Sequence, residues 1–177
     1  MKGADFEKAL GFVLGAEGGY TDDPADRGGA TNKGITQSEY TDWLRRQHLP
    51  LRSVRHILNI EVEEIYRDAY WLEGDCDRLP WPVNLVHFDA CVNTGVTQAA
   101  RFLPRSVDAE PDGQIGPKTL EALRALLERE TPLAVAERLV RRREPFYRRL
   151  AEVDPTQNRF LQGWLNRVSF LKKALAS

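Results

Sequence analysis

The spacing of hydrophobic residues along the chain predicts a mainly helical protein. Apolar residues recur every three or four positions from Phe6 to Leu14, which predicts a first amphipathic helix over about residues 4–16. The stretch "VNLVHFDACVN" is apolar on nearly every side, which indicates a central buried helix. Further helices are expected at 37–47, 53–59, 61–72, 96–103, 117–129, 132–151 and 158–175.

The segment between the first two helices has a different composition. Residues 20–36 contain few apolar positions and many Asp, Gly, Pro, Thr and Asn residues, which predicts an irregular hairpin or a long loop. Pro80 and Pro82 mark a later break, and "DAEPDGQIGP" is the clearest turn in the second half. The expected fold class is therefore mainly α, with one small β-hairpin or loop after the first helix.

Composition changes this picture in one respect, which is the distribution of charge. A chain of 177 residues with 42% hydrophobic residues can bury the core of one compact domain or of two small, closely packed ones. Residues 1–92 hold 10 Lys/Arg and 16 Asp/Glu, whereas residues 93–177 hold 15 and 10. The basic half can attract an anionic polymer such as cell wall or nucleic acid. Its densest stretch, "RLVRRREPFYRR", is interpreted as an ordinary solvated helix face.

Several classes of protein are not expected. Cys76 and Cys91 are too few for a disulfide framework, and whether they pair stays open. The histidines are scattered without metal-ligand spacing, so neither a metal site nor a cofactor is expected. The first residues lack the apolar run of a secretory signal, and no segment approaches the ~18 apolar residues of a membrane span. We expect a chain made in the cytoplasm, without stable membrane insertion.

Glu17 is the first candidate for chemistry. It follows the first predicted helix and lies within about 20° of Phe6 on the helical wheel, so it continues the buried stripe. A carboxylate there meets the negative end of the helix dipole, and an apolar surround would disfavour its ionised form further. A glutamate that stays protonated can act as the general acid that cleaves a glycosidic bond. The alternative is a helix-end residue bonded to nearby backbone or to an arginine.

Glycoside cleavage usually needs a second carboxylate. The loop after Glu17 offers Asp22, Asp23 and Asp26 for that role. Thr31, Asn32 and Thr36 are candidates to position water or a sugar amide, and Gly28, Gly29 and Gly34 permit a tight backbone there. Each of these residues taken singly is also an ordinary turn residue.

Three longer motifs join these residues. The stretch "FVLGAEGGYTDDPADRGGATNKGIT" combines a helix ending in Glu-Gly-Gly-Tyr with Asp-Pro-x-Asp-x-Gly-Gly-x-Thr-Asn-x-Gly-Ile-Thr. Ile-Tyr-Arg-x-x-Tyr-Trp and Phe-Asp-x-x-Val-Asn-x-Gly follow it, and "NTGVTQAARFL" and "DGQIGPKTLEAL" come later. Together they resemble glycoside hydrolase family 108, the N-acetylmuramidases of phage endolysins and secretion-associated wall hydrolases, with the predicted peptidoglycan-binding region that usually follows. The likeness covers about residues 6–167.

The resemblance implies a lysozyme-like helical fold and cleavage of the β-1,4 bond between N-acetylmuramic acid and N-acetylglucosamine in peptidoglycan. It implies a muramidase region over residues 1–92 and a helical peptidoglycan-binding region over 93–177, packed into one unit. Glu17 is then the essential acid. Glu17, Asp26 and Thr31 are also similar to the Glu, Asp, Thr triplet of phage-type lysozymes, although the second gap is one residue shorter. On this basis Asp26 and Thr31 orient water.

The chain departs from the family at Leu103-Pro104, where the binding region commonly has Leu-Gln. A proline there is expected to end the helix early and to weaken wall binding.

Aromatic residues near the expected cleft are candidates to pack on sugars. Tyr20, Tyr70 and Trp71 are kept as candidate substrate contacts, Trp81 lies near the same elements, and Tyr66 falls on an inward stripe and is assigned to the core. Asp89 and Asn93 lie four residues apart on the apolar central helix, where an unpaired polar group is costly. They either hydrogen-bond within the core or line the cleft floor.

The expected function is therefore a peptidoglycan hydrolase, an endolysin that acts on the wall after release through a holin-type pore, another export route or lysis. The alternatives are a lytic transglycosylase on the same bond and a non-catalytic wall-binding or secretion accessory protein. We expect a monomer, and no nucleic-acid partner because no base-reading motif is present.

Overall fold

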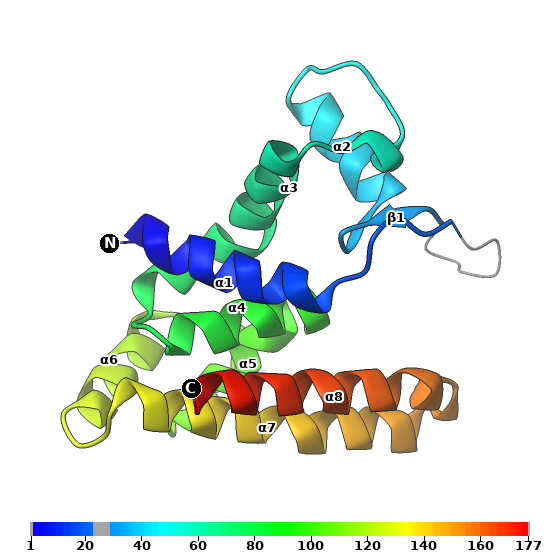
Figure 1. The fold of residues 1–177 in the computed structure, drawn as a ribbon. Coiled ribbons are helices and arrows are strands. Elements are labelled where there is room, and N and C mark those ends of the chain that lie inside the picture. Colours follow the sequence, from blue (N-terminus) through cyan, green and yellow to red (C-terminus); the bar gives the residue numbers. More distant parts are fainter. Residues whose placement is uncertain (1, 23–28, 177) are drawn as a thin grey trace.

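The computed structural model describes residues 2–22 and 29–176. Figure 1 shows a mainly helical molecule with one small hairpin at its side, next to α2. The elements are α1 (Lys2–Ala16), β1 (Thr31–Asn32), β2 (Ile35–Thr36), α2 (Gln37–Arg46), α3 (Asn59–Tyr66), α4 (Val83–Thr94), α5 (Val96–Ser106), α6 (Pro117–Leu127), α7 (Pro132–Val153) and α8 (Asn158–Leu175). Short 3₁₀ turns lie at Val54–His56, Cys76–Arg78 and Pro155–Gln157, and a π-helical segment at Arg67–Leu72 continues α3. The predicted mainly α class with a hairpin after the first helix is confirmed.

The hairpin has two-residue strands joined by a two-residue turn. Thr31 pairs with Thr36 and Asn32 with Ile35 in an antiparallel register. Lys33 and Gly34 between them both have positive φ, 52° and 77°, the backbone that matches the twist of a two-residue hairpin. The turn is thereby brought back against the end of α1.

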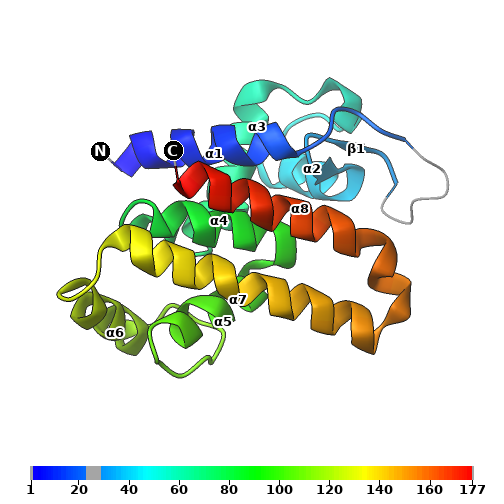
Figure 2. The ribbon, with the colours of Figure 1, turned by 60° about the horizontal axis from the view of Figure 1, so that its bottom comes forward.

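Helix α4 forms the centre of the core, as its apolar sequence predicts. It contacts α1, α5, α7 and the turns between Arg67 and Arg78. Figure 1 shows it between α1 and the antiparallel pair of α7 and α8, and Figure 2 shows the same pair lying side by side from below. Every residue of α4 from Val83 to Cys91 is buried.

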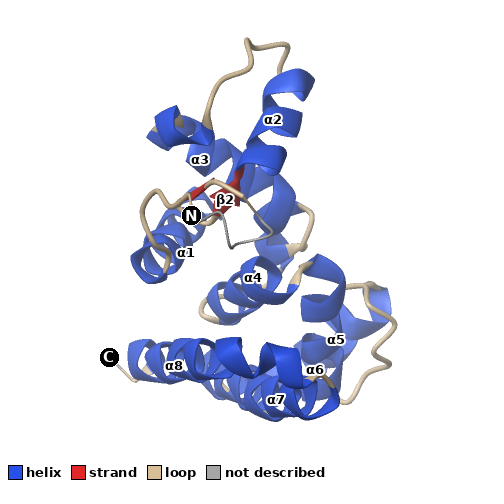
Figure 3. Cartoon of the chain, turned by 90° about the vertical axis from the view of Figure 1, so that its right-hand side faces the viewer, coloured by secondary structure: helices blue, strands red, loops and turns tan. Residues whose placement is uncertain are grey.

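The lobe that carries the hairpin lies on the other side of α1 and α4. Figure 3 shows α2, α3 and the hairpin gathered there, away from α7 and α8. Among the described residues, no helix is both long enough and apolar enough to cross a membrane.

The prediction that Pro104 ends its helix early is wrong. α5 continues through Pro104 to Ser106. Pro104 removes only the backbone bond to the carbonyl of Ala100, and the helix ends two residues later. The carbonyl of Pro104 still accepts bonds from the backbone of Val107 at 3.1 Å and Ala109 at 2.9 Å, and the Ser106 hydroxyl donates to Phe102 at 2.8 Å.

A buried polar cluster joins α2 to the start of α3. Glu61 accepts hydrogen bonds from the Tyr40 hydroxyl and the Leu58 backbone, both at 2.8 Å, and an ion pair from Arg52. Burial by itself would raise the pKa of Glu61, but the bonds from Leu58, Tyr40 and Arg52 outweigh it and hold that pKa below its ordinary value.

Replacing Glu61 tests this cluster. Because the folded-state pKa is lowered, ionised Glu61 stabilises the fold above the ordinary value of 4.5, and that stability is lost as the pH falls through the lower folded value. Glu61→Gln should therefore be less stable to urea at neutral pH and should lose less stability than the wild type on acidification below that range. Glu64→Gln, at an exposed position of the same helix, is the control and should follow the wild-type curve. Parallel pH dependence of Glu61→Gln and wild type would contradict the assignment.

Candidate active site

The end of α1 places Glu17 between two distant parts of the chain. Its carboxylate Oε1 accepts a hydrogen bond from Arg167 Nη1 of α8 at 2.6 Å, and the side chain is 19% exposed. Its Oε2 faces the hairpin turn, since a Cβ added at Gly34 would lie 2.9 Å from Oε2 and 2.6 Å from the Tyr66 hydroxyl. Only a glycine at position 34 lets the turn approach this closely.

The expectation of an apolar surround for Glu17 is wrong. Its carboxylate forms an ion pair with the Arg167 guanidinium. The structure thus shows the arginine-bonded state, one of the two readings that helix position alone leaves open.

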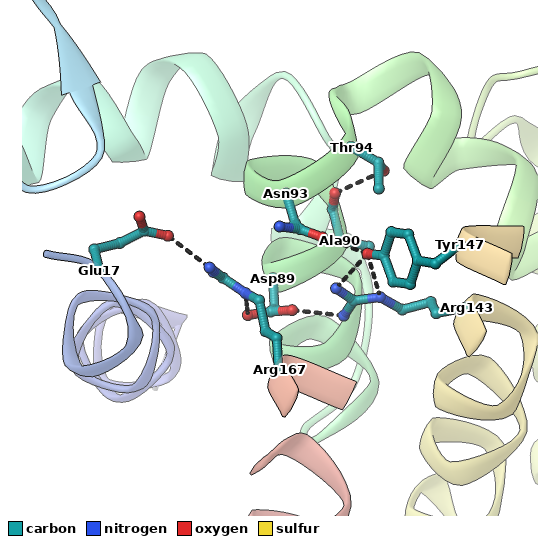
Figure 4. A network of polar contacts seen from close by, with 8 residues as sticks. All are labelled: Glu17, Asp89, Ala90, Asn93, Thr94, Arg143, Tyr147 and Arg167. Carbon is teal, nitrogen blue, oxygen red and sulfur yellow. Dashed lines mark hydrogen bonds and ion pairs between the residues drawn. The ribbon is translucent and has the colours of Figure 1, made fainter. Parts of the chain in front are cut away.

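Arg167 connects Glu17 to a chain of buried polar groups, drawn in Figure 4. Its Nε donates to Asp89 Oδ1 of α4 at 2.8 Å, and the other oxygen of Asp89 accepts from Arg143 Nη1 of α7 at 2.5 Å. Arg143 Nη2 donates to the Tyr147 hydroxyl at 2.9 Å, and that hydroxyl donates to Asn93. The chain of contacts therefore ties α1, α4, α7 and α8 together.

Charge balance explains why these polar groups are tolerated in the core. Asp89 and Arg143 have no exposed surface, so burial acts to lower the pKa of Arg143, but Asp89 and Tyr147 outweigh it and raise that pKa. Burial also acts to lower the pKa of Arg167. The neighbouring carboxylates of Asp89 and Glu17 outweigh this effect and raise that pKa above its ordinary value. Two carboxylates and two guanidinium groups alternate, so each buried charge has an opposite neighbour.

The predicted solvated face of α7 is only partly right. Arg141, Arg148 and Arg149 are exposed, whereas Arg143 is completely buried. The same network gives Asp89 and Asn93 hydrogen-bonding roles within the core, with Asn93 also reaching a surface hollow.

Glu17 lies between two open hollows. One, of about 520 Å³, is lined by Leu10, Leu14, Glu17, Gly18, Gly19, Lys33, Asn59 and Glu63. The other, of about 400 Å³, is lined by Gly15, Ala16, Asn93, Gly163, Trp164, Asn166, Arg167 and Phe170. Hollows of about 540 and 680 Å³ lie away from Glu17, so size alone does not mark the site. Glu17 lines the first of these hollows, and its ion-pair partner Arg167 lines the second.

The other predicted catalytic residues belong to the loop and the hairpin. Asp26, together with Asp23 and Gly28, lies outside the described residues. Thr31 is in β1, where its backbone also pairs with Thr21. Asp22 is exposed and accepts a hydrogen bond from the Tyr20 hydroxyl at 3.2 Å. Among the described residues, Glu17 is the predicted catalytic carboxylate whose side chain forms an ion pair.

Several predicted substrate contacts have structural partners instead. Asn32 is buried and donates to the carbonyl of Val54 at 3.1 Å, and Thr36 caps α2 by accepting a bond from the Glu39 backbone at 3.2 Å. Trp71 is in the core against Phe6 and Phe88, where a glycan at the surface does not reach it.

Two predicted aromatic contacts stay near the surface. Tyr20 is exposed, with Arg55 over its ring at 5.0 Å. Tyr70 is half-buried, packs against Tyr66 and donates a hydrogen bond to Glu39 at 3.2 Å. Burial, followed by the charge of Glu39, raises the pKa of Tyr70 above its ordinary value, so its hydroxyl remains a donor at neutral pH.

Sequence reasoning missed Arg167, which stands 150 residues from Glu17. A signal was present, because Arg167 falls on the apolar stripe of α8 with Trp164, Val168 and Leu171. A charged residue on a buried stripe needs a buried partner. The position of Tyr66 was predicted as core, but the place of its hydroxyl beside Glu17 was not.

Comparison with known proteins agrees with the motifs. Residues 10–95 match the family model described as Glycosyl hydrolase 108, and residues 95–169 match the model described as Predicted Peptidoglycan domain. Twelve chains of solved structures match. One of them, SagA from Brucella abortus, is 31% identical, with a TM-score of 0.78, over 99% of this chain and 95% of that chain. No curated protein sequence matched.

Gly34→Ala tests the close approach of the hairpin to Glu17. Its φ of +77° strains an alanine, and the new Cβ would overlap the Tyr66 hydroxyl and the Glu17 carboxylate. We expect a loss of more than about 1 kcal/mol in the free energy of unfolding, measured in urea. Gly11→Ala is the control, because nothing lies within 4 Å of a Cβ there and an alanine inside α1 should add about 0.5–1 kcal/mol. Equal stability of Gly34→Ala and wild type would contradict the geometry.

Proposed function

Because this chain belongs to the glycosyl hydrolase 108 family, it is a glycoside hydrolase that acts on peptidoglycan, and we propose that it cleaves the β-1,4 bond between N-acetylmuramic acid and N-acetylglucosamine with Glu17 as proton donor. The observation that carries this proposal is the position of Glu17. Its carboxyl group is held at a fixed point between two open hollows, and one of them has Glu17 in its wall.

Arg167 positions the acid in this proposal. Because it binds Oε1, the other oxygen, Oε2, is left for the proton that goes to the leaving sugar oxygen. The same guanidinium also binds Asp89, which fixes its orientation beside Glu17. Arg167 Nη2 is buried and has no hydrogen-bond partner among the described residues.

Asp26 and Thr31 remain our proposal for the groups that orient the attacking water. In an inverting enzyme the two carboxyl groups stand about 6.5–9.5 Å apart, which leaves room for that water. Tyr20 and Tyr70, which stay near the surface, are our candidates for packing against sugar rings. Asn93, at the other hollow, is our candidate for a hydrogen bond to the glycan.

Glu17→Gln tests the proton donor. The amide keeps an oxygen that accepts from Arg167 but has no acidic proton, so the variant should fold and should still sediment with peptidoglycan. It should no longer reduce the turbidity of wall suspensions. Glu7→Gln, at an exposed position of α1, is the control and should lyse walls at the wild-type rate.

The products decide between the proposed hydrolysis and transglycosylation. Mass spectrometry of muropeptides released by the wild type should show a reducing muramic acid end. A 1,6-anhydro end would identify a lytic transglycosylase, and undiminished lysis by Glu17→Gln would remove Glu17 from the chemistry.

Arg167→Met tests positioning. Without the guanidinium the carboxyl group is less well held, and a misplacement of this kind can lower the turnover rate by up to about 100-fold. The measurement is the rate of muropeptide release per folded molecule together with the free energy of unfolding in urea, with Arg159→Met as an exposed control on α8. A wild-type rate of release by the folded Arg167→Met variant would mean that Arg167 serves stability alone.

A further inference from the structure

The fold gathers three metal-binding side chains that the sequence keeps apart. Cys76 comes from the 3₁₀ turn Cys76–Arg78, and His87 and Cys91 come from α4. All three are buried, both cysteines are free thiols, and their possible ligand atoms lie within 4.8 Å of one another. The expectation of no metal site rested on linear spacing, and this cluster is formed by folding.

Helix geometry explains how α4 serves two polar clusters. His87 and Cys91 are four residues apart and share one face, while Asp89 and Asn93 share the face about 200° away. The first pair faces Gly74 and Cys76, and the second faces α7 and α8. The Cys/His cluster is therefore separate from the contacts of Glu17.

The distances within the cluster resemble the edges of a metal-centred tetrahedron. Cys91 Sγ is 3.7 Å from His87 Nε2. The Gly74 carbonyl oxygen is 2.9 Å from the same nitrogen and 3.9 Å from Cys76 Sγ. Bonds of about 2.0–2.3 Å to zinc place neighbouring ligand atoms roughly 3.3–3.8 Å apart. The ligand atoms of the three side chains lie within 4.8 Å of one another, so they approach such positions if the widest separation shortens by about 1 Å.

We propose that Cys76, His87 and Cys91 bind one divalent cation of the zinc class, with the Gly74 carbonyl beside them as an oxygen donor. Each thiol gives up its proton as its sulfur binds the metal, and the imidazole binds through neutral Nε2. Two thiolates balance the two charges of the cation, so the loaded cluster adds no net charge to the core.

Gly74 lies between the cluster and a surface hollow. It lines a hollow of about 540 Å³ together with Asp75, Arg78 and Val96. Its backbone passes so close to the cluster that a Cβ at this position would lie 2.7 Å from Cys91 Sγ. A bound cation would join the turn after Arg67–Leu72 to α4, the helix that carries Asp89.

The test is a titration of the reduced, full-length protein with Co²⁺. Binding should produce thiolate-to-cobalt charge-transfer absorption and the visible bands of tetrahedral Co²⁺, saturating at one ion per chain. Added Zn²⁺ should displace the cobalt and raise Tm, because a ligand bound only by the folded state stabilises it. Cys76→Ser and Cys91→Ser should lose the charge-transfer signal, and His56→Gln, at an exposed histidine, should keep it.

Two results would overturn the proposal. One is absence of the charge-transfer signal in the reduced wild type, which does not depend on whether any variant folds. The other is a chain, isolated without reductant, that is lighter by two hydrogens and has no titratable thiols, since this would identify a Cys76–Cys91 disulfide in place of a metal site.

Discussion

Buried charge in the middle of a helical core constrains the rest of this structure. Asp89 is fully buried on α4, and each of its two oxygens is bound by an arginine from a different helix, Arg143 of α7 and Arg167 of α8. Removing one member of such a group leaves an uncompensated charge in the core, which typically costs about 3–5 kcal/mol. The relative positions of these helices are therefore fixed by electrostatics as well as by packing. Glu17 is held in turn by its ion pair with Arg167.

This arrangement makes the two halves of the chain interdependent. The two family models meet at residue 95, yet Glu17 lies in the first matched region and its partner Arg167 lies in the second. The peptidoglycan-binding-like region thus supplies a side chain to the candidate active site. In functional terms, the second half helps to hold the proposed acid in addition to any contact it makes with the wall.

Helix α4 links these features because it is buried on all sides and still carries polar residues. A helix in that position pairs most of the polar groups that it buries. Asp89 and Asn93 find partners towards α7 and α8, and His87 Nε2 lies beside Cys91 and the Gly74 carbonyl, while His87 Nδ1 has no hydrogen-bond partner among the described residues. The catalytic proposal and the metal proposal therefore concern opposite faces of the same helix.

The sequence by itself determined the helices, the hairpin after α1 and the buried character of α4, and it singled out Glu17 as the candidate acid. These features depend on local periodicity, turn residues and motif spacing, which are properties of short segments. The tertiary structure decided which groups meet: Arg167 with Glu17, Arg143 with Asp89, and Cys76 with His87 and Cys91. It also decided that Trp71 is core and that α5 continues through Pro104. The physical reason is that periodicity shows which face of a helix is buried, whereas the partner on the other side of that face is chosen only when distant segments pack together.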